Sequence, residues 1–123
     1  MFSPEFVTSA QVVDDVLVFG LRLNWFRPLP LSCIEELTVL VDGTPLPEGL
    51  LVLDGTGFPA EQLVDQDDVW WRLSSDAELR LPWADQEPPD EVRVIVRTRI
   101  PLLVDHTGSP VVVTDTASVA VAA

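Results

Sequence analysis

A strict alternation of apolar and polar residues constrains the fold of this chain more than any other feature. In residues 16–25 the apolar side chains fall at every second position, on one face of an extended strand: Leu17, Phe19, Leu21, Leu23 and Trp25. Residues 91–100 repeat the pattern with Val92, Val94, Val96, Thr98 and Ile100, while their opposite face carries a ladder of Arg93, Arg97 and Arg99. A period of two is typical of a half-buried β-strand, so both segments are predicted to be long strands.

Shorter segments of the same kind complete an all-β prediction. They are residues 37–41, 50–53, 69–73, 78–81 and 111–121, the last with a break expected near residues 114–116. Only residues 59–64 favour a helical turn, and no segment has the helical periodicity needed to connect parallel strands. We therefore predict one domain over residues 1–123, an antiparallel β-sandwich of about seven strands with at most one short helical turn.

The dipeptide Asp42-Gly43 marks a hairpin. It follows a segment in which Leu37, Val39 and Val41 alternate with other residues. A two-residue hairpin turn of the primed type requires positive φ at both central positions, which Asp and Gly tolerate. The sequence thus predicts a strand that ends at a tight turn.

The charge of the chain excludes several classes of partner. Twenty acidic residues against seven arginines, with no lysine, give a formal net charge of −13. Such a chain repels phosphate groups, so neither a nucleic-acid nor a membrane partner is expected. No apolar run approaches the roughly 18 residues of a membrane helix, the first ten residues lack a basic signal region, and Cys33 is the single cysteine. These features predict a cytoplasmic protein without disulfides.

A cluster of aromatic, arginine and proline residues precedes the predicted hairpin in the sequence. Its prolines lack an N–H for a sheet ladder, so the segment must leave the sheet or lie at its edge. We expect it either to fold over the core or to bind a partner, and we assign it as the partner interface: Trp25, Phe26, Arg27, Pro28, Leu29, Pro30, Leu31 and Ser32. In this interpretation Arg27 offers a guanidinium fork to a partner, while Leu29 and Leu31 are apolar anchors.

A second candidate contact is the pair Trp70 and Trp71. Neighbouring residues of a strand face opposite ways, so only one of the two indoles can enter the core. The other is predicted to be exposed or covered by a partner, as tryptophans in binding hot spots are.

Residues with catalytic potential are sparse. His106, beside Asp105, is the only imidazole, and a triad would need Ser109 or Ser32 as nucleophile. The residues around His106 are typical of an ordinary turn, and they do not form the pattern of a nucleophile elbow. We therefore predict no catalytic residue in this chain.

The acidic residues do not form a predicted metal or acid–base site. Asp65, Asp67 and Asp68 lack the glycine and the distal glutamate of an EF-hand loop, which favours a solvated loop. Two adjacent pairs, Glu35-Glu36 and Asp14-Asp15, are expected to point to opposite sides of any strand. No metal ligand and no cofactor are predicted in this chain.

Three segments together resemble a known family. They are WFRPLPLSCIEELTVLVDGTPLP, VWWRL and EVRVIVRTRIPLL. Their order and separation are similar to those of the small, or beta, subunit of bacterial C-glycoside deglycosidases, across residues 2–104. The resemblance implies a β-sandwich subunit of a hetero-oligomer with a larger TIM-barrel alpha subunit, which holds the catalytic base and a divalent metal, Mn or Mg.

The same resemblance implies a reaction class. The complex would be a carbon–carbon lyase that acts on 3-oxo-C-glycosides, typically flavonoid C-glucosides, by β-elimination. This chain would be its non-catalytic subunit. Two other interpretations stay open: a stand-alone carbohydrate-binding or immunoglobulin-like β-sandwich module, and a small hydrolase that uses His106.

Overall fold

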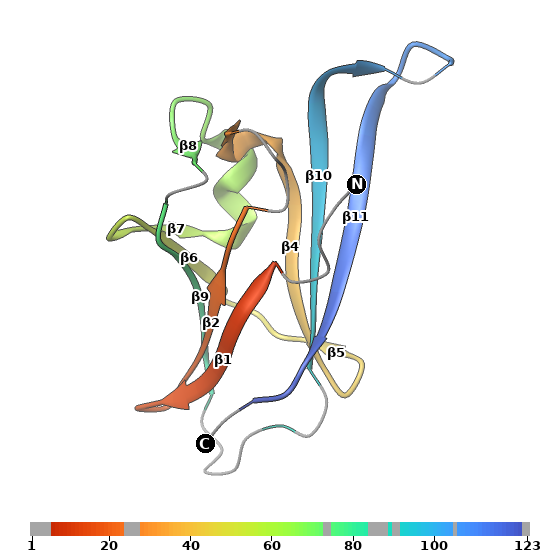
Figure 1. The fold of residues 1–123 in the computed structure, drawn as a ribbon. Coiled ribbons are helices and arrows are strands. Elements are labelled where there is room, and N and C mark those ends of the chain that lie inside the picture. The colour runs from red at the N-terminus through yellow and green to blue at the C-terminus, as the bar shows by residue number, and fades with distance from the viewer. Residues whose placement is uncertain are drawn as a thin grey trace.

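In a computed structural model of the chain, the structure describes residues 6–23, 28–72, 75–83, 89, 92–104 and 106–121. Within these residues it contains eleven strands, every pair of them antiparallel, and two short 3₁₀ helices (Figure 1). The all-β antiparallel prediction is confirmed. The strands beyond the expected number of about seven are β1 (Val7–Val13) and the short strands β3 (Leu29–Pro30), β5 (Thr44–Pro45) and β7 (Thr56–Pro59).

The first layer is a five-stranded sheet with the order β1-β2-β9-β6-β7. Its strands are β1 (Val7–Val13), β2 (Val16–Leu21), β9 (Ala77–Pro82), β6 (Leu50–Leu53) and β7 (Thr56–Pro59). β2, β9 and β6 lie in its interior because each pairs on both sides. β1 and β7 are therefore its edges.

The second layer is a four-stranded sheet with the order β11-β10-β4-β5. Its strands are β11 (Pro110–Val119), β10 (Val92–Val104), β4 (Ile34–Val41) and β5 (Thr44–Pro45). β10 pairs with β4 only as far as Thr98, and its remaining residues pair with β11 alone. The far end of the β10–β11 hairpin therefore extends beyond the sandwich as a two-stranded arm (Figure 1).

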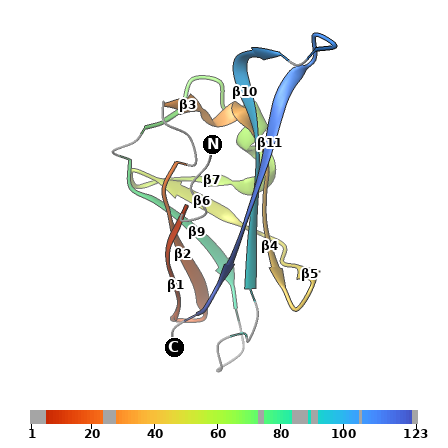
Figure 2. The same ribbon diagram turned by 45° about the vertical axis from the view of Figure 1, so that its right-hand side comes forward.

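One apolar core fills the space between these two layers, which Figure 2 shows from the side. The alternation in the sequence decides which side chains enter it: Leu17, Phe19 and Leu21 from β2, and Val92, Val94 and Val96 from β10 are all buried. The arginines of the other β10 face are exposed. The sequence assignment of inner and outer faces is confirmed within β2 and β10. The predicted extent of the first strand to Trp25 is wrong, because β2 ends at Leu21, and Trp25 itself lies outside the described residues.

The residue types in two turns explain why the β4–β5 hairpin was predicted and the β1–β2 hairpin was not. Asp42 and Gly43 have φ of 50° and 82°, so the primed turn between β4 and β5 is confirmed. Asp14 and Asp15 make the same kind of turn, with φ of 49° and 63°, and join β1 to β2. Without a glycine this pair gives a weaker turn signal, which is why β1 was not predicted.

The predicted break near residues 114–116 is wrong. β11 runs without interruption, and its register with β10 is continuous from Val111 to Val119. Thr114 and Thr116 lie on the exposed face and Asp115 on the half-buried one. A polar sequence is accommodated here because β10 supplies the backbone hydrogen bonds all along the strand.

Candidate interaction surface

Pairing of β3 (Leu29–Pro30) with β8 (Trp70–Trp71) joins the two segments that the sequence singled out. Leu29 lies opposite Trp71, and Pro30 lies opposite Trp70. Beyond the short ladder, the Leu31 N–H donates to the Val69 carbonyl over 2.8 Å. The ladder is short because Pro30 has no N–H to donate. These residues form a small sheet of their own at one end of the sandwich (Figure 2).

The inward side of this end is locked into the core. Leu31 is fully buried, Leu29 is 3% exposed and Trp71 is 2% exposed. Leu31 and Ser32 belong to the 3₁₀ helix η1 (Leu31–Cys33), and the Ser32 N–H donates to the Gln66 carbonyl. The role of Leu29 and Leu31 as outward apolar anchors is therefore wrong, because both side chains fill this chain's own core.

The outward side carries apolar groups that are exposed or half-buried, which we call the Trp70 surface: Pro28, Pro30, Val64, Val69 and Trp70. Trp70 is 47% exposed and Val64, on the second 3₁₀ helix η2 (Ala60–Asp65), is 46% exposed. The prediction that only one indole of the pair enters the core is confirmed. η2 packs on η1, so the two exposed side chains share one end of the molecule (Figure 1).

An acidic loop borders the Trp70 surface. Asp65 ends η2, Asp67 and Asp68 lie between η2 and β8, and all three are exposed. The structure describes no salt bridge for these carboxylates within its ranges. An apolar centre with a polar, hydrated rim is the usual anatomy of a protein–protein contact.

The remaining members of the predicted interface differ in their exposure to solvent. Pro28 is exposed, Pro30 is half-buried and Ser32 is buried. Trp25, Phe26 and Arg27 lie outside the described residues. Their assignment stays a prediction.

One polar atom beneath this surface is unusual. The indole Nε1 of Trp71 is buried and has no hydrogen-bond partner among the described residues. An unsatisfied buried donor costs about 1–3 kcal/mol. The large apolar area of the indole offsets this cost, so Trp71 stays in the core for packing rather than for hydrogen bonding.

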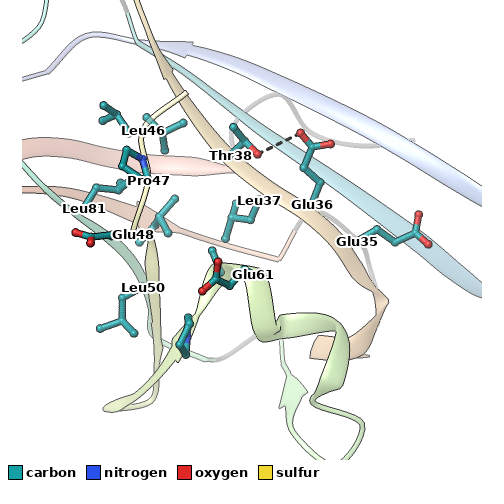
Figure 3. Close-up of a pocket in the computed structure, with 15 residues that line it drawn as sticks. Glu35, Glu36, Leu37, Thr38, Leu46, Pro47, Glu48, Leu50, Glu61 and Leu81 are labelled. Carbon is teal, nitrogen blue, oxygen red and sulfur yellow. Dashed lines mark hydrogen bonds between the residues drawn. The ribbon is translucent and has the colours of Figure 1, made fainter. Parts of the chain in front are cut away.

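A shallow cavity of about 510 Å³ lies on another side of the sandwich, between β4, residues 46–49 and η2 (Figure 3). Leu46, Leu50, Leu79 and Leu81 supply apolar lining, and Glu36, Glu48 and Glu61 supply carboxylates. Its described lining contains no histidine, cysteine or basic residue. The cavity thus offers apolar and carboxylate contacts, without a nucleophile or an imidazole base.

A β-bulge next to this cavity changes the geometry of one acidic pair. Arg97 lies opposite Glu36 and the next residue, Thr98, lies opposite Ile34, so Glu35 is the extra residue. The Arg97 guanidinium lies 3.8 Å from Glu35 and 3.6 Å from Glu36. The expectation that these carboxylates point to opposite sides is wrong, because the bulge turns both toward one arginine.

His106 differs in exposure from Ser32, one of the two serines considered as its partner. It is exposed in the loop at the end of the β10–β11 arm, whereas Ser32 is buried in η1. Ser109 accepts a hydrogen bond from the Thr107 hydroxyl over 3.3 Å. Asp105 lies outside the described residues. Among the described side chains, no group of three or more His, Cys, Asp or Glu is placed to hold a metal ion.

The described ranges also contain no helix of the length and apolarity that a membrane crossing requires. Among the described residues, the Trp70 surface is our candidate for contact with a protein partner.

Comparison with known proteins gives two relatives. The chain is 38% identical over 122 residues to a protein from Microbacterium sp named 3'-dehydrocarminate deglycosidase beta subunit. The aligned region covers 94% of this chain and 91% of that relative. It is 36% identical over 91 residues, 71% of this chain and 70% of the relative, to a C-glycoside deglycosidase beta subunit from Arthrobacter globiformis. No protein-family model matches the chain.

Proposed function

Since the chain belongs to the family of C-glycoside deglycosidase beta subunits, we propose that it is the small, non-catalytic subunit of such an enzyme. The observation that carries this proposal is the similarity over 94% of the chain to a protein with that name. A likeness of this extent covers both sheets and the Trp70 surface, rather than one motif. The subunit name also implies a second, different subunit.

The proposed partner is a larger TIM-barrel subunit that binds the Trp70 surface. Trp70 and Val64 supply exposed apolar area, and the neighbouring aspartates supply charges at the rim. Arg27, next in sequence to the exposed Pro28, is proposed to donate to a carboxylate or carbonyl of the partner. The buried Leu31 and Trp71 hold this surface in place from below.

The proposed reaction is the cleavage of the carbon–carbon bond in a 3-oxo-C-glycoside, such as an oxidised flavonoid C-glucoside. A ketone at C3 acidifies the proton at C2, so that a base can remove it while the aglycone carbon leaves C1 in a β-elimination. As the family resemblance implies, we place the base in the larger subunit. A divalent metal, Mn or Mg, bound there would supply charge stabilisation to the ketone oxygen.

Co-expression tests this proposal directly. The full chain is produced with and without a TIM-barrel alpha subunit of this enzyme family, and native mass spectrometry gives the mass of each assembly. Each sample is then incubated with a 3-oxo-C-glucoside, and the free aglycone is measured by liquid chromatography. We expect a stable hetero-oligomer, and full aglycone release only when both subunits are present. Full release by the larger subunit alone would contradict a requirement for this chain.

The exposure of Trp70 also favours a second candidate, a carbohydrate-binding module, because aromatic faces stack on sugars. That function predicts a lone chain that binds saccharides unaided and ignores the TIM-barrel protein. Titration of the isolated chain with glucosides, followed by tryptophan fluorescence, separates the two. Saccharide binding without formation of the hetero-oligomer would favour the binding module.

A further inference from the structure

The outer edge of β11 differs from the other edges of the two main sheets. β5 has two residues and β7 has four, while β1 has seven residues and a register shift between Val7 and Ser9. β11 has ten residues and a continuous register from Val111 to Val119. Within the described ranges, β11 pairs only with β10. Short strands and bulges protect an edge from pairing with another chain, and β11 has neither.

The backbone groups on this edge can be identified from the hydrogen bonds of β4. The Val39 carbonyl accepts from the Leu46 N–H over 2.9 Å, so Val39 directs its backbone groups away from β10. Its partner Val94 must then direct its own backbone groups toward β11, where it lies opposite Ala117. Because the direction alternates along a strand, residues 112, 114, 116 and 118 turn their N–H and C=O groups outward. These four residues form what we call the β11 edge.

The side chains of the β11 edge favour close approach of a second copy. They are Val112, Thr114, Thr116 and Ser118, all exposed and all uncharged, in a chain with a net charge of −13. Arg93, Arg97 and Arg99, three of the seven arginines, lie exposed on the neighbouring strand β10. Because its four side chains are uncharged, this edge adds no like-charge repulsion of its own when two acidic copies approach.

We propose that the β11 edges of two copies pair antiparallel about a two-fold axis and join two four-stranded sheets into one of eight strands. Such a contact is self-complementary, because each outward N–H of one copy meets an outward C=O of the other. Registers with Thr114 or Thr116 on the axis place Asp115 opposite Val113 or Ala117 of the second copy. The register centred on Asp115 places two carboxylates opposite one another, and it is disfavoured.

This contact lies apart from the Trp70 surface and goes beyond the proposed function. The hetero-oligomer would hold two small subunits in contact with each other, each free to bind its larger subunit. The Trp70 surface and the β11 edge can be tested separately, because the proposed association with the larger subunit does not require the β11 edge.

Sedimentation equilibrium of the full chain over a wide range of concentrations tests the proposal. We expect a concentration-dependent dimer. Thr116→Lys places one positive charge on the β11 edge of each copy. It should raise the dissociation constant of the dimer about tenfold or more, because a two-fold dimer contains the substitution twice. Thr116→Pro removes an outward N–H and should act in the same direction. Gln11→Lys, an equal charge change at an exposed site on β1, is the matched control and should leave the constant within about twofold.

Two results would overturn the proposal. One is a wild-type chain that stays monomeric at every concentration, and the other is a dimer on which Thr116→Lys acts no more than Gln11→Lys. Binding to the larger subunit is measured on the same preparations. If Thr116→Lys abolishes that binding while the isolated wild type is monomeric, the β11 edge serves the larger subunit and the proposed self-pairing fails. If the wild type does not bind the larger subunit at all, the proposed function fails instead.

Discussion

The two neighbouring tryptophans should separate binding from stability when each is changed to alanine. Trp70 is 47% exposed and Trp71 is 2% exposed, although the two are adjacent on β8. Trp70→Ala should leave the folded subunit nearly as stable as wild type but weaken its association with the larger subunit. Trp71→Ala should destabilise the isolated subunit by about 3–5 kcal/mol, because it opens a cavity in the core.

The magnitude for Trp70 follows from its exposed area. A tryptophan offers roughly 250 Å² for burial, so 47% leaves roughly 120 Å² for a partner to cover. At about 25 cal/mol per Å² this area is worth at most about 3 kcal/mol. Alanine retains part of the contact, so we expect a loss of about 1–3 kcal/mol, or a dissociation constant raised about 5- to 150-fold.

Two measurements check this pair of predictions. Calorimetric titration against the larger subunit gives the dissociation constant, and urea unfolding of the isolated chain gives the free energy of unfolding. Val13→Ala is the matched control, because Val13 is 43% exposed and ends β1 beside the Asp14-Asp15 turn, outside the Trp70 surface. If Trp70→Ala and Val13→Ala bind the larger subunit equally well, the assignment of the Trp70 surface as the interface is refuted.

Three further changes test other parts of the reasoning. Arg27→Ala should reduce co-elution with the larger subunit and leave the circular dichroism spectrum unchanged, and normal co-elution would contradict its assigned role. Leu31→Ala should lower the free energy of unfolding in urea by about 2–5 kcal/mol, because Leu31 is fully buried; a loss below about 1 kcal/mol would refute its place in the core. Asp15→Gly should raise the melting temperature, gaining up to about 1 kcal/mol, because Asp15 has φ of 63° in the β1–β2 turn. A lower melting temperature for this variant would show that the turn does not strain the aspartate.

Local patterns were sufficient for the sheet architecture. The alternation in β2 and β10 identified their buried faces, because side-chain direction in a strand depends only on position along it. The turn at Asp42-Gly43 was equally visible, since both residue types tolerate positive φ. The hairpin at Asp14-Asp15 escaped prediction because its residues adopt that conformation only when the flanking strands pair.

Two residues of the predicted interface, Leu29 and Leu31, belong to the core instead, for a related reason. The sequence indicated that residues 25–32 were special and that one of Trp70 and Trp71 had to face outward. It did not reveal that Leu29 pairs opposite Trp71, which turns the leucine inward and leaves Trp70 on the surface. Which side of a short segment is buried depends on a partner strand some forty residues away.

The sequence by itself therefore determined the all-β class, the net charge of −13 and the family to which the chain is similar. Only the tertiary structure decided that Leu31 is core, that Glu35 and Glu36 both face Arg97, and that β11 continues through Thr114 and Thr116 to present a long edge. The physical reason is that periodicity and turn preference act within a few residues, whereas burial, bulges and strand edges are set by pairing between distant segments.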